Sequence, residues 1–434
     1  MLSNLLQAFK TPDLRRKILF TLVIIIVFRL GSFVPTPGVD YTKVASCTAT
    51  IESNDLLGLI NLFSGGALLQ LSVFALGIMP YITASIIVQM LRIVIPRFEA
   101  LYKEGQAGQT KMTQYTRYLT VGLAILQSTT IITTARIGTL FGNAGGDCKQ
   151  VIPDQSIPTL LVMIIVMTAG TSLIMWFGEL VTERGVGNGM SVLIFTSICA
   201  KFLPSLWSIA QGNGGFVKFA VVLVIIIAIM VVVVYIEQSQ RRIPVQYAKQ
   251  SIAGRTVGGG DTYLPMKLNM SGVIPIIFAS SILALPGLIA KFGDQNAGWV
   301  QWINQFLANQ TSWVHITFYA FLIIFFCFFY TSITFNPDEI SDNMKNQGGF
   351  IPGIRAGSST ADYLRYVLYR INTAGSLYLM IVALVPTILI LVLGLSQSLP
   401  FGGTTILIIV GVGLETVRQI NSQLQQHHYD GFLS

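Results

Sequence analysis

The chain has 434 residues, of which 53% are hydrophobic and only 11% are charged, and its formal net charge is +8. An ordinary soluble domain carries about 25% charged residues, so this composition excludes such a domain and predicts a protein that crosses the membrane several times. Backbone groups in lipid must be hydrogen-bonded within their own segment, and the apolar runs do not alternate with polar residues as barrel strands would. The spans are therefore predicted to be helices.

Ten apolar runs are bounded by charges or by Gly and Pro clusters and are long enough to be spanning helices. The first run, ILFTLVIIIVFRLGSFV (18–34), is interpreted as a retained span rather than a signal peptide, because it lacks a small-residue cleavage site. The second, fifth and seventh runs contain many polar or small residues, which suits contact with protein or water better than with lipid. In chain order the predicted spans are about 18–35, 70–92, 117–135, 157–178, 186–204, 216–236, 271–290, 313–334, 372–394 and 402–419.

Lysine and arginine orient these spans, because cytoplasmic loops are enriched in both residues. With the N-terminus inside, 20 of the 27 cations fall on the cytoplasmic side, 6 fall outside, and Arg29 lies within the first span. An even number of spans then predicts that both termini are cytoplasmic.

Two cytoplasmic loops, about 239–270 and 335–371, are longer than a simple connection requires. The first carries five cations and one acid around a Gly-rich centre, which predicts a hairpin that projects from the membrane. One interpretation is a solvated loop near lipid head groups. The other is a docking surface for an acidic or RNA-rich partner.

A short apolar segment lies on the outer side between the first two spans. Residues 56–63 form about two helical turns before SGGA breaks the helix, which is too short to cross a bilayer. This segment either lies in the interface or folds back into a cavity of the protein.

Two similar decapeptides stand five spans apart, GIMPYITASI at 77–86 and GVIPIIFASS at 272–281. Because they run in opposite directions across the membrane, they predict an inverted repeat of two five-helix halves, with chance similarity as the alternative. Pro80 and Pro275 are expected to loosen each helix. Ile82 and Ile86, like Ile277 and Ser281, are four residues apart and share one helix face, which favours a common interior.

No enzyme constellation, nucleotide-binding loop or metal-binding spacing of Cys and His is found in the sequence, so no cofactor is expected. Cys47 and Cys148 fall in loops on the outer side, where a disulfide between them is left open as a possibility. A secondary transporter remains an alternative function, since inverted repeats and broken helices are typical of that class as well. It would usually keep an ionisable residue at the membrane midplane, whereas Arg29 is placed near the outer half of its span, where packing or snorkelling accounts for it. A purely structural membrane scaffold is a third hypothesis for the function.

Long motifs along the whole chain resemble the SecY family, the channel subunits of bacterial protein-export translocons. The motifs are FRLGSFVPTPG (28–38), LINLFSGGAL (59–68), FALGIMPYITASIIVQML (74–91), ERGVGNGMSVLIF (183–195), QRRIPVQYAK (240–249), GVIPIIFASSIL (272–283), FNPDEISDNMKNQGGFIPGIR (335–355) and LPFGGTTILIIV (399–410). The resemblance implies an all-α hourglass of ten helices in two halves, 1–210 and 211–434, located in the bacterial cytoplasmic membrane.

The resemblance also implies roles for two sets of residues. The segment of about 56–67 corresponds to a plug that blocks the outer funnel, with Leu59, Ile60, Asn61, Leu62, Phe63, Ser64, Gly65 and Gly66 at its centre. The apolar ring at the waist corresponds to Ile82, Ile86, Met190, Ile194, Ile277 and Ile408, where Met190 departs from the expected branched aliphatic residue. Such a ring can exclude water and ions while accepting many different chains, because it offers no fixed hydrogen-bond pattern.

A lateral exit into lipid is implied between the second and third spans on one side and the seventh and eighth on the other. Polar residues expected to bridge this seam are Ser85, Gln89, Gln127 and Ser281. The two long loops correspond to docking sites for the ribosome, including its RNA, and for the motor ATPase SecA, with Arg242, Lys249, Arg255 and Arg355 as the contact residues. Small membrane subunits similar to SecE and SecG, signal peptides, nascent chains and the lipid bilayer complete the implied partners.

Overall fold

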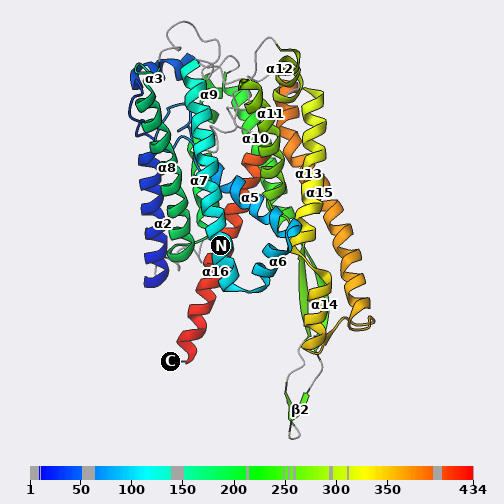
Figure 1. Cartoon of the computed structure of the whole chain (residues 1–434). Coiled ribbons are helices and arrows are strands. Elements are labelled where there is room, and N and C mark those ends of the chain that lie inside the picture. Colours follow the sequence, from blue (N-terminus) through cyan, green and yellow to red (C-terminus); the bar gives the residue numbers. More distant parts are fainter. Residues whose placement is uncertain are drawn as a thin grey trace.

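The structure is a computed structural model and describes residues 9, 11–50, 64–137, 151–211, 215–247, 250–252, 255–257, 261–292, 297–309, 312–393 and 403–433. It is a bundle of long helices with a small β-structure at one end (Figure 1). The helices of the first part of the chain are α2 (Pro12–Gly31), α3 (Tyr41–Thr50), α5 (Met79–Val94), α6 (Pro96–Lys103), α7 (Gln106–Ile137), α8 (Ile157–Arg184) and α9 (Gly189–Gln211). Those of the second part are α10 (Gly215–Gln238), α11 (Ile274–Phe292), α12 (Gly298–Trp302), the π-helix η2 (Ile303–Ala308), α13 (Trp313–Thr334), α14 (Pro337–Asn346), α15 (Ser358–Leu393) and α16 (Gly403–Leu433).

Each predicted span coincides with a helix, although several boundaries differ; α7, for example, begins at Gln106 rather than at 117. The second span was predicted to begin at residue 70, but residues 70–78 form turns and α5 begins at Met79. Helix α15 begins at Ser358, well before the predicted boundary, so the second long loop ends there rather than at 371. Helix α16 continues to Leu433, so the predicted tail is helical. Polar helix ends that project beyond lipid carry no apolar signal, which is why hydropathy missed them.

Membrane-crossing capacity is clearest in a subset of these helices. Within the described part of the chain, five helices are long and apolar enough to cross a membrane by length and composition alone, and the bent pair α5 and α6 makes a sixth if it is one span. The most apolar is α10, whose side chains are also the least buried of the five. A helix that is apolar all round and largely uncovered is suited to contact with lipid.

The predicted cytoplasmic hairpin is present. Strands β1 (Gln240–Tyr247) and β4 (Asp261–Lys267) pair antiparallel, and β2 (Gln250–Ile252) pairs with β3 (Arg255–Val257) nearer the tip. A third strand, β5 (Gly349–Phe350), adds to β1 from the second long loop, giving the strand order β4-β1-β5. The two loops that the sequence treats separately therefore form one sheet.

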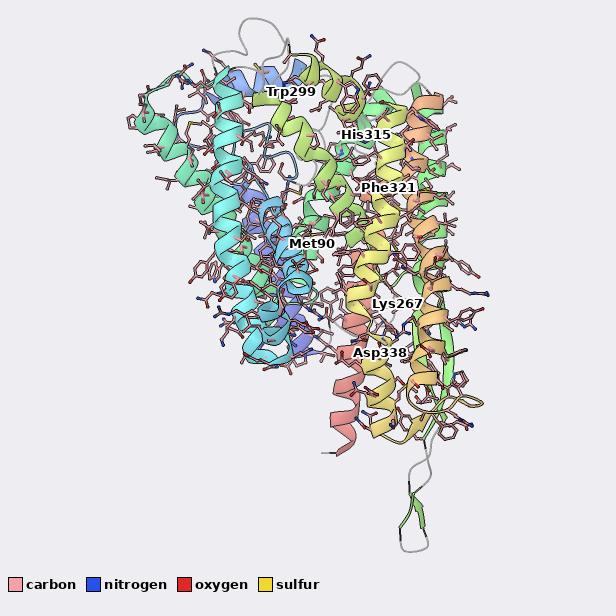
Figure 2. All side chains as sticks on the ribbon, turned by 45° about the vertical axis from the view of Figure 1, so that its right-hand side comes forward. Met90, Lys267, Trp299, His315, Phe321 and Asp338 are labelled. Atoms are coloured by element: carbon pink, nitrogen blue, oxygen red, sulfur yellow. The ribbon has the colours of Figure 1, made fainter. Side chains whose placement is uncertain are left out.

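The two ends of the bundle differ in the way the charge bias predicts. The hairpin, α14 and the end of α16 project from one end, whereas α3 and α12 lie at the other (Figure 1). Figure 2 shows Trp299 and His315 toward the end with α12, and Lys267 and Asp338 toward the end with the hairpin. Because the basic hairpin and the C-terminal helix share one end, that end is the cytoplasmic one.

The two copies of the repeated decapeptide have the same backbone arrangement at the starts of α5 and α11. Gly77 and Gly272 both have positive φ, 56° and 62°, just before a helix begins. Pro80 and Pro275 are then the second residues of α5 and α11. The expectation that these prolines loosen their helices is wrong, because an amide in the first helical turn has no intrahelical hydrogen bond to lose. Each copy instead turns the chain and starts a helix.

Candidate functional site

The residues predicted for the apolar ring come from four helices that are far apart in the sequence. Five of the six belong to one apolar cluster, called the waist cluster below: Ile82 of α5, Met190 and Ile194 of α9, Ile277 of α11 and Ile408 of α16. Side chains of α2 and α8 surround them in the same cluster. The sixth residue, Ile86, packs instead against the neighbouring cluster built by α10, α11, α13, α15 and α16. The structure thus brings most of the predicted ring together.

Burial within the waist cluster is uneven. Ile194, Ile277 and Ile408 are buried, whereas Ile82 and Met190 are partly exposed. Gly178 of α8 leaves room for the Met190 thioether, since a Cβ there would overlap it. A ring of such side chains makes contacts that do not depend on direction, and it offers water no hydrogen bond.

The predicted plug falls mostly outside the described residues, which include Ser64, Gly65 and Gly66 but not residues 59–63. Gly65 and Gly66 have positive φ, 66° and 95°, in the turn that leads toward α5. The Ser64 hydroxyl accepts a hydrogen bond from the Leu68 amide at 3.1 Å. This turn is the part of the predicted plug whose surroundings can be described.

Two cations contact the turn at Gly65 and Gly66, which is called the clasped turn below. The sequence did not predict this role for either cation. Arg29 of α2 donates from Nη1 to the Gly65 carbonyl oxygen at 3.2 Å and lies 5.3 Å from the ring centroid of Phe33. Lys201 of α9 lies so close to Gly66 that a Cβ at Gly66 would overlap its side chain. The position of Arg29 inside an apolar span could have indicated a buried partner. The sequence could not identify that partner, because Gly65 is 36 positions away in the chain.

The residues predicted for the lateral seam are arranged differently from the expectation. Gln89 donates to the Ser85 hydroxyl at 3.4 Å, within the same helix α5. The Ser281 hydroxyl on α11 is buried and has no hydrogen-bond partner among the described residues. Gln127 is half-buried on α7. Among the described residues no hydrogen bond of Ser85, Gln89 or Ser281 to another helix is found, although α5 and α11 do contact each other.

The cytoplasmic sheet presents the predicted docking cations unequally. Arg242 is exposed on β1 and lies 4.9 Å from the ring centroid of Tyr263. Arg355 is exposed between Gly353 and Gly357, both of which have positive φ. The Arg255 backbone lies in β3, its side chain is outside the described set, and Lys249 lies outside the described residues altogether.

The loop that carries Arg355 is fixed from both sides. Thr360 donates to the Arg355 carbonyl oxygen at 2.8 Å, and Ser341 of α14 donates to the Gly357 carbonyl oxygen at 2.6 Å. Arg365 of α15 bonds both carboxylate oxygens of Asp338 on α14 at 3.1 Å. A cation held on a braced, exposed loop is preorganised for a partner and loses little entropy on binding.

On the outer side, Cys47 of α3 is disulfide-bonded, whereas Cys199 and Cys327 are free thiols. Cys148, the remaining cysteine of the sequence, lies outside the described residues.

Comparison with known proteins identifies the family of this chain. The sequence model of the SecY family matches residues 72–417. Protein translocase subunit SecY of Streptomyces scabiei is 58% identical, and that of Mycobacterium tuberculosis is 54% identical, each over the full length of both chains. The chain belongs to the SecY family. This assignment confirms the resemblance, and it gives no support to the small-solute transporter.

Solved structures of the SecY fold agree with the arrangement described above. A structure described as that of a protein-conducting channel matches with a TM-score of 0.60 at 16% identity, covering 94% of this chain and 92% of its own. Sec61 in a canine ribosome–channel complex matches with a TM-score of 0.57 at 16% identity and the same coverage. The all-α polytopic fold is thereby confirmed, and a SecY-family chain is a multi-pass channel subunit of the cytoplasmic membrane rather than an enzyme.

Proposed function

We propose that this chain is the channel subunit through which unfolded secretory polypeptides cross the cytoplasmic membrane, with its seal at the waist cluster. The observation that carries the proposal is the meeting of Ile82, Met190, Ile194, Ile277 and Ile408 from four separate helices in one apolar cluster. An apolar constriction resists water and ions at rest, yet it can accept a polypeptide of any sequence when its helices separate.

The chain acts as two halves, 1–210 and 211–434, that meet around this cluster. The repeated start of α5 and α11 supports this division, because a positive-φ glycine and a proline open both helices. Separation of the halves between α5 and α11 would open a path into lipid for transmembrane segments. An unpartnered Ser281 and an intrahelical Gln89 bond leave few polar contacts to break there.

The clasped turn at Gly65 and Gly66 anchors the plug of this channel. Arg29 and Lys201 come from α2 and α9, so they tie the turn to two helices that also contribute to the waist cluster. The plug then adds a second, outer seal that a translocating chain has to displace.

The cytoplasmic sheet is the docking surface for the ribosome and for a motor ATPase. Its support is the exposure of Arg242 and Arg355 on two loops that share one sheet. Arginine suits this role because its planar guanidinium binds phosphate or carboxylate with two hydrogen bonds. Small membrane subunits similar to SecE and SecG are the further partners of this channel.

The test is the resting conductance of the purified chain in planar bilayers. Ile408→Asn combined with deletion of residues 60–67 is expected to leak ions, because a polar side chain wets the constriction and the outer seal is lost. Leu126→Asn, the same kind of change at an exposed position on α7, is the matched control and should stay tight. A tight Ile408→Asn deletion variant would overturn the pore path.

A further inference from the structure

A row of polar side chains links three helices, α10, α13 and α15, to the segment just before α11. It is called the polar chain below and consists of Glu237 of α10, Asn269 and Ser271 before α11, Cys327 and Thr331 of α13, and Asn372 of α15. Cys327 itself belongs to the apolar cluster to which α10, α11, α13, α15 and α16 contribute.

The first part of the polar chain closes the base of the cytoplasmic hairpin. Asn269 donates from Nδ2 to Glu237 Oε1 at 2.6 Å and to the Gly272 carbonyl oxygen at 3.1 Å. Ser271 donates from Oγ to Asn269 Oδ1 at 3.2 Å. Glu237 lies in the last turn of α10 just before β1, and Asn269 follows β4, so these bonds join the two ends of the hairpin at its base.

The second part of the polar chain crosses to α13 and α15. The Ser271 hydroxyl and the Cys327 thiol are 3.3 Å apart. The single Cys327 thiol proton is shared between Ser271 Oγ and Asn372 Oδ1, each 3.3 Å from Sγ. The Thr331 hydroxyl proton likewise has two acceptors, the Cys327 carbonyl oxygen at 2.8 Å and Asn372 Oδ1 at 2.9 Å. Asn372 therefore gathers both polar side chains of α13 at one acceptor.

Burial of these side chains makes the loss of any of their hydrogen bonds costly. Asn269, Ser271, Cys327, Thr331 and Asn372 are each at most 6% exposed. A buried polar group that loses its partner keeps the cost of its desolvation, so removing one member weakens the others. Polar side chains within spanning helices are uncommon unless function retains them.

The position of the polar chain relates the hairpin to the waist. The Leu268 amide donates to the Ser239 carbonyl oxygen at 3.1 Å, and a Cβ at Gly375 of α15 would lie 2.5 Å from the Leu268 carbonyl oxygen. Helix α11 starts at Ile274 and carries Ile277 of the waist cluster in its first turn. The segment held by Asn269 and Ser271 is thus the base from which a waist residue projects.

We propose that the polar chain fixes the start of α11 against α13 and α15 and thereby holds the waist closed until the cytoplasmic hairpin is moved by a partner. This inference rests on the proposed function, because it takes the waist cluster as the seal. Its residues are positioning residues: they act on Ile277 through the backbone of 269–274 and do not touch the translocating polypeptide.

Thr331 offers a sharp test, since valine keeps its shape and serine keeps its hydroxyl. In planar bilayers with the full chain, Thr331→Val is expected to raise the resting conductance roughly three- to twenty-fold, the factor that matches interhelical hydrogen bonds measured in membranes. Thr331→Ser should restore the wild-type value. Thr334→Val is the matched control, because the Thr334 hydroxyl bonds only the Tyr330 carbonyl oxygen of its own helix.

Two further variants keep the test decisive. Cys327→Ala removes the link between Ser271 and Asn372 and should leak as well, so a poorly folding Thr331→Val would not end the experiment. Thr331→Val combined with Asn372→Leu should leak no more than Asn372→Leu alone, because Asn372→Leu already removes the bond between Thr331 and Asn372.

The outcomes separate this inference from the proposed function. If Ile408→Asn with deletion of 60–67 leaks but Thr331→Val and Cys327→Ala stay tight, the waist is the seal and the polar chain does not control it. Equal leaks in Thr331→Val, Thr331→Ser and Thr334→Val would also overturn the inference. If the Ile408→Asn deletion variant is tight, the proposed function itself fails.

Discussion

The waist cluster and the polar chain lie in one helix bundle but join their helices by different forces. The waist cluster brings Ile194, Ile277 and Ile408 together through apolar contacts that have no preferred direction. The polar chain joins its helices through hydrogen bonds at fixed angles and distances, such as Thr331 to Asn372 at 2.9 Å. Apolar contacts tolerate sliding and separation, whereas a buried hydrogen bond is either made or lost.

Because of this contrast, one helix can be both movable at the waist cluster and fixed at its start. Helix α11 contributes Ile277 to the waist cluster, and the segment just before it contributes Asn269 and Ser271 to the polar chain. A seal that must accept many polypeptides benefits from contacts without chemical specificity. A joint that must return to one resting position benefits from directional contacts.

The largest effect is expected from Asn372→Ala, which breaks the polar chain at its shared acceptor. Cys327 and Thr331 both lose their common acceptor, and the free energy of unfolding should fall by about 1–3 kcal/mol. Thermal unfolding of the detergent-solubilised chain measures this loss. Thr373→Ala is the control, because that exposed hydroxyl bonds only the Tyr369 carbonyl oxygen. Equal stability of Asn372→Ala and Thr373→Ala would show that the shared acceptor in the polar chain does not stabilise the fold.

The next largest effect is expected at the turn of Gly65 and Gly66, because the hydrogen bond from Arg29 holds a part of the proposed plug. Arg29→Gln removes the cationic donor to the Gly65 carbonyl oxygen, a bond of about 1 kcal/mol once its partial exposure is discounted. Resting conductance in planar bilayers should rise, and Arg29→Lys should restore part of the seal. Arg136→Gln, at an exposed cation at the outer end of α7, serves as the control. A tight Arg29→Gln channel would show that the turn is held without this bond.

The waist cluster should tolerate a change of similar volume that the polar chain would not. Met190→Leu keeps an apolar side chain in the space beside Gly178, so it should cost less than about 1.5 kcal/mol and leave the resting conductance unchanged. Thr331→Val, which also conserves volume, is expected to leak. If Met190→Leu leaked and Thr331→Val did not, the comparison between the two regions would be reversed.

The smallest effect on stability is expected from Arg355→Ala on the cytoplasmic loop. An exposed side chain away from buried networks usually changes the free energy of unfolding by less than about 0.5 kcal/mol. Motor-driven export into vesicles should nevertheless fall, because the docking cation is lost. Arg370→Ala, at another exposed cytoplasmic cation, which stacks on Tyr366, is the control for charge. Equal export by both variants would place docking elsewhere.

Much of the fold could be predicted from sequence, because its signals are local. Apolar runs such as 216–236 and 313–334 correspond closely to α10 and α13, since transfer of each residue into lipid depends mainly on its own side chain. The hairpin at 239–270 followed from its Gly-rich centre. The start of α5 was predicted too early, because hydropathy does not distinguish an apolar turn from an apolar helix.

The candidate site was predictable only in part. Sequence resemblance selected the residues of the ring, and five of the six do meet in the waist cluster. It missed the partners of Arg29 and Lys201, and the Ser281 hydroxyl, expected to bridge the seam, has no hydrogen-bond partner among the described residues. These contacts depend on how each helix is rotated about its axis, and composition carries little information about rotation in spans that are apolar on all sides.

Hydropathy and charge act on each segment separately, so the sequence alone specifies a bundle of membrane-crossing helices, the end that faces the cytoplasm and the loops that carry most cations. The pairing of β1 with β5 across more than one hundred positions, and the meeting of Asn269, Cys327 and Asn372 in one polar chain, depend on the tertiary structure. Hydrogen bonds between distant segments require specific atoms within about 3.5 Å of each other, and that condition is set by packing rather than by any local pattern.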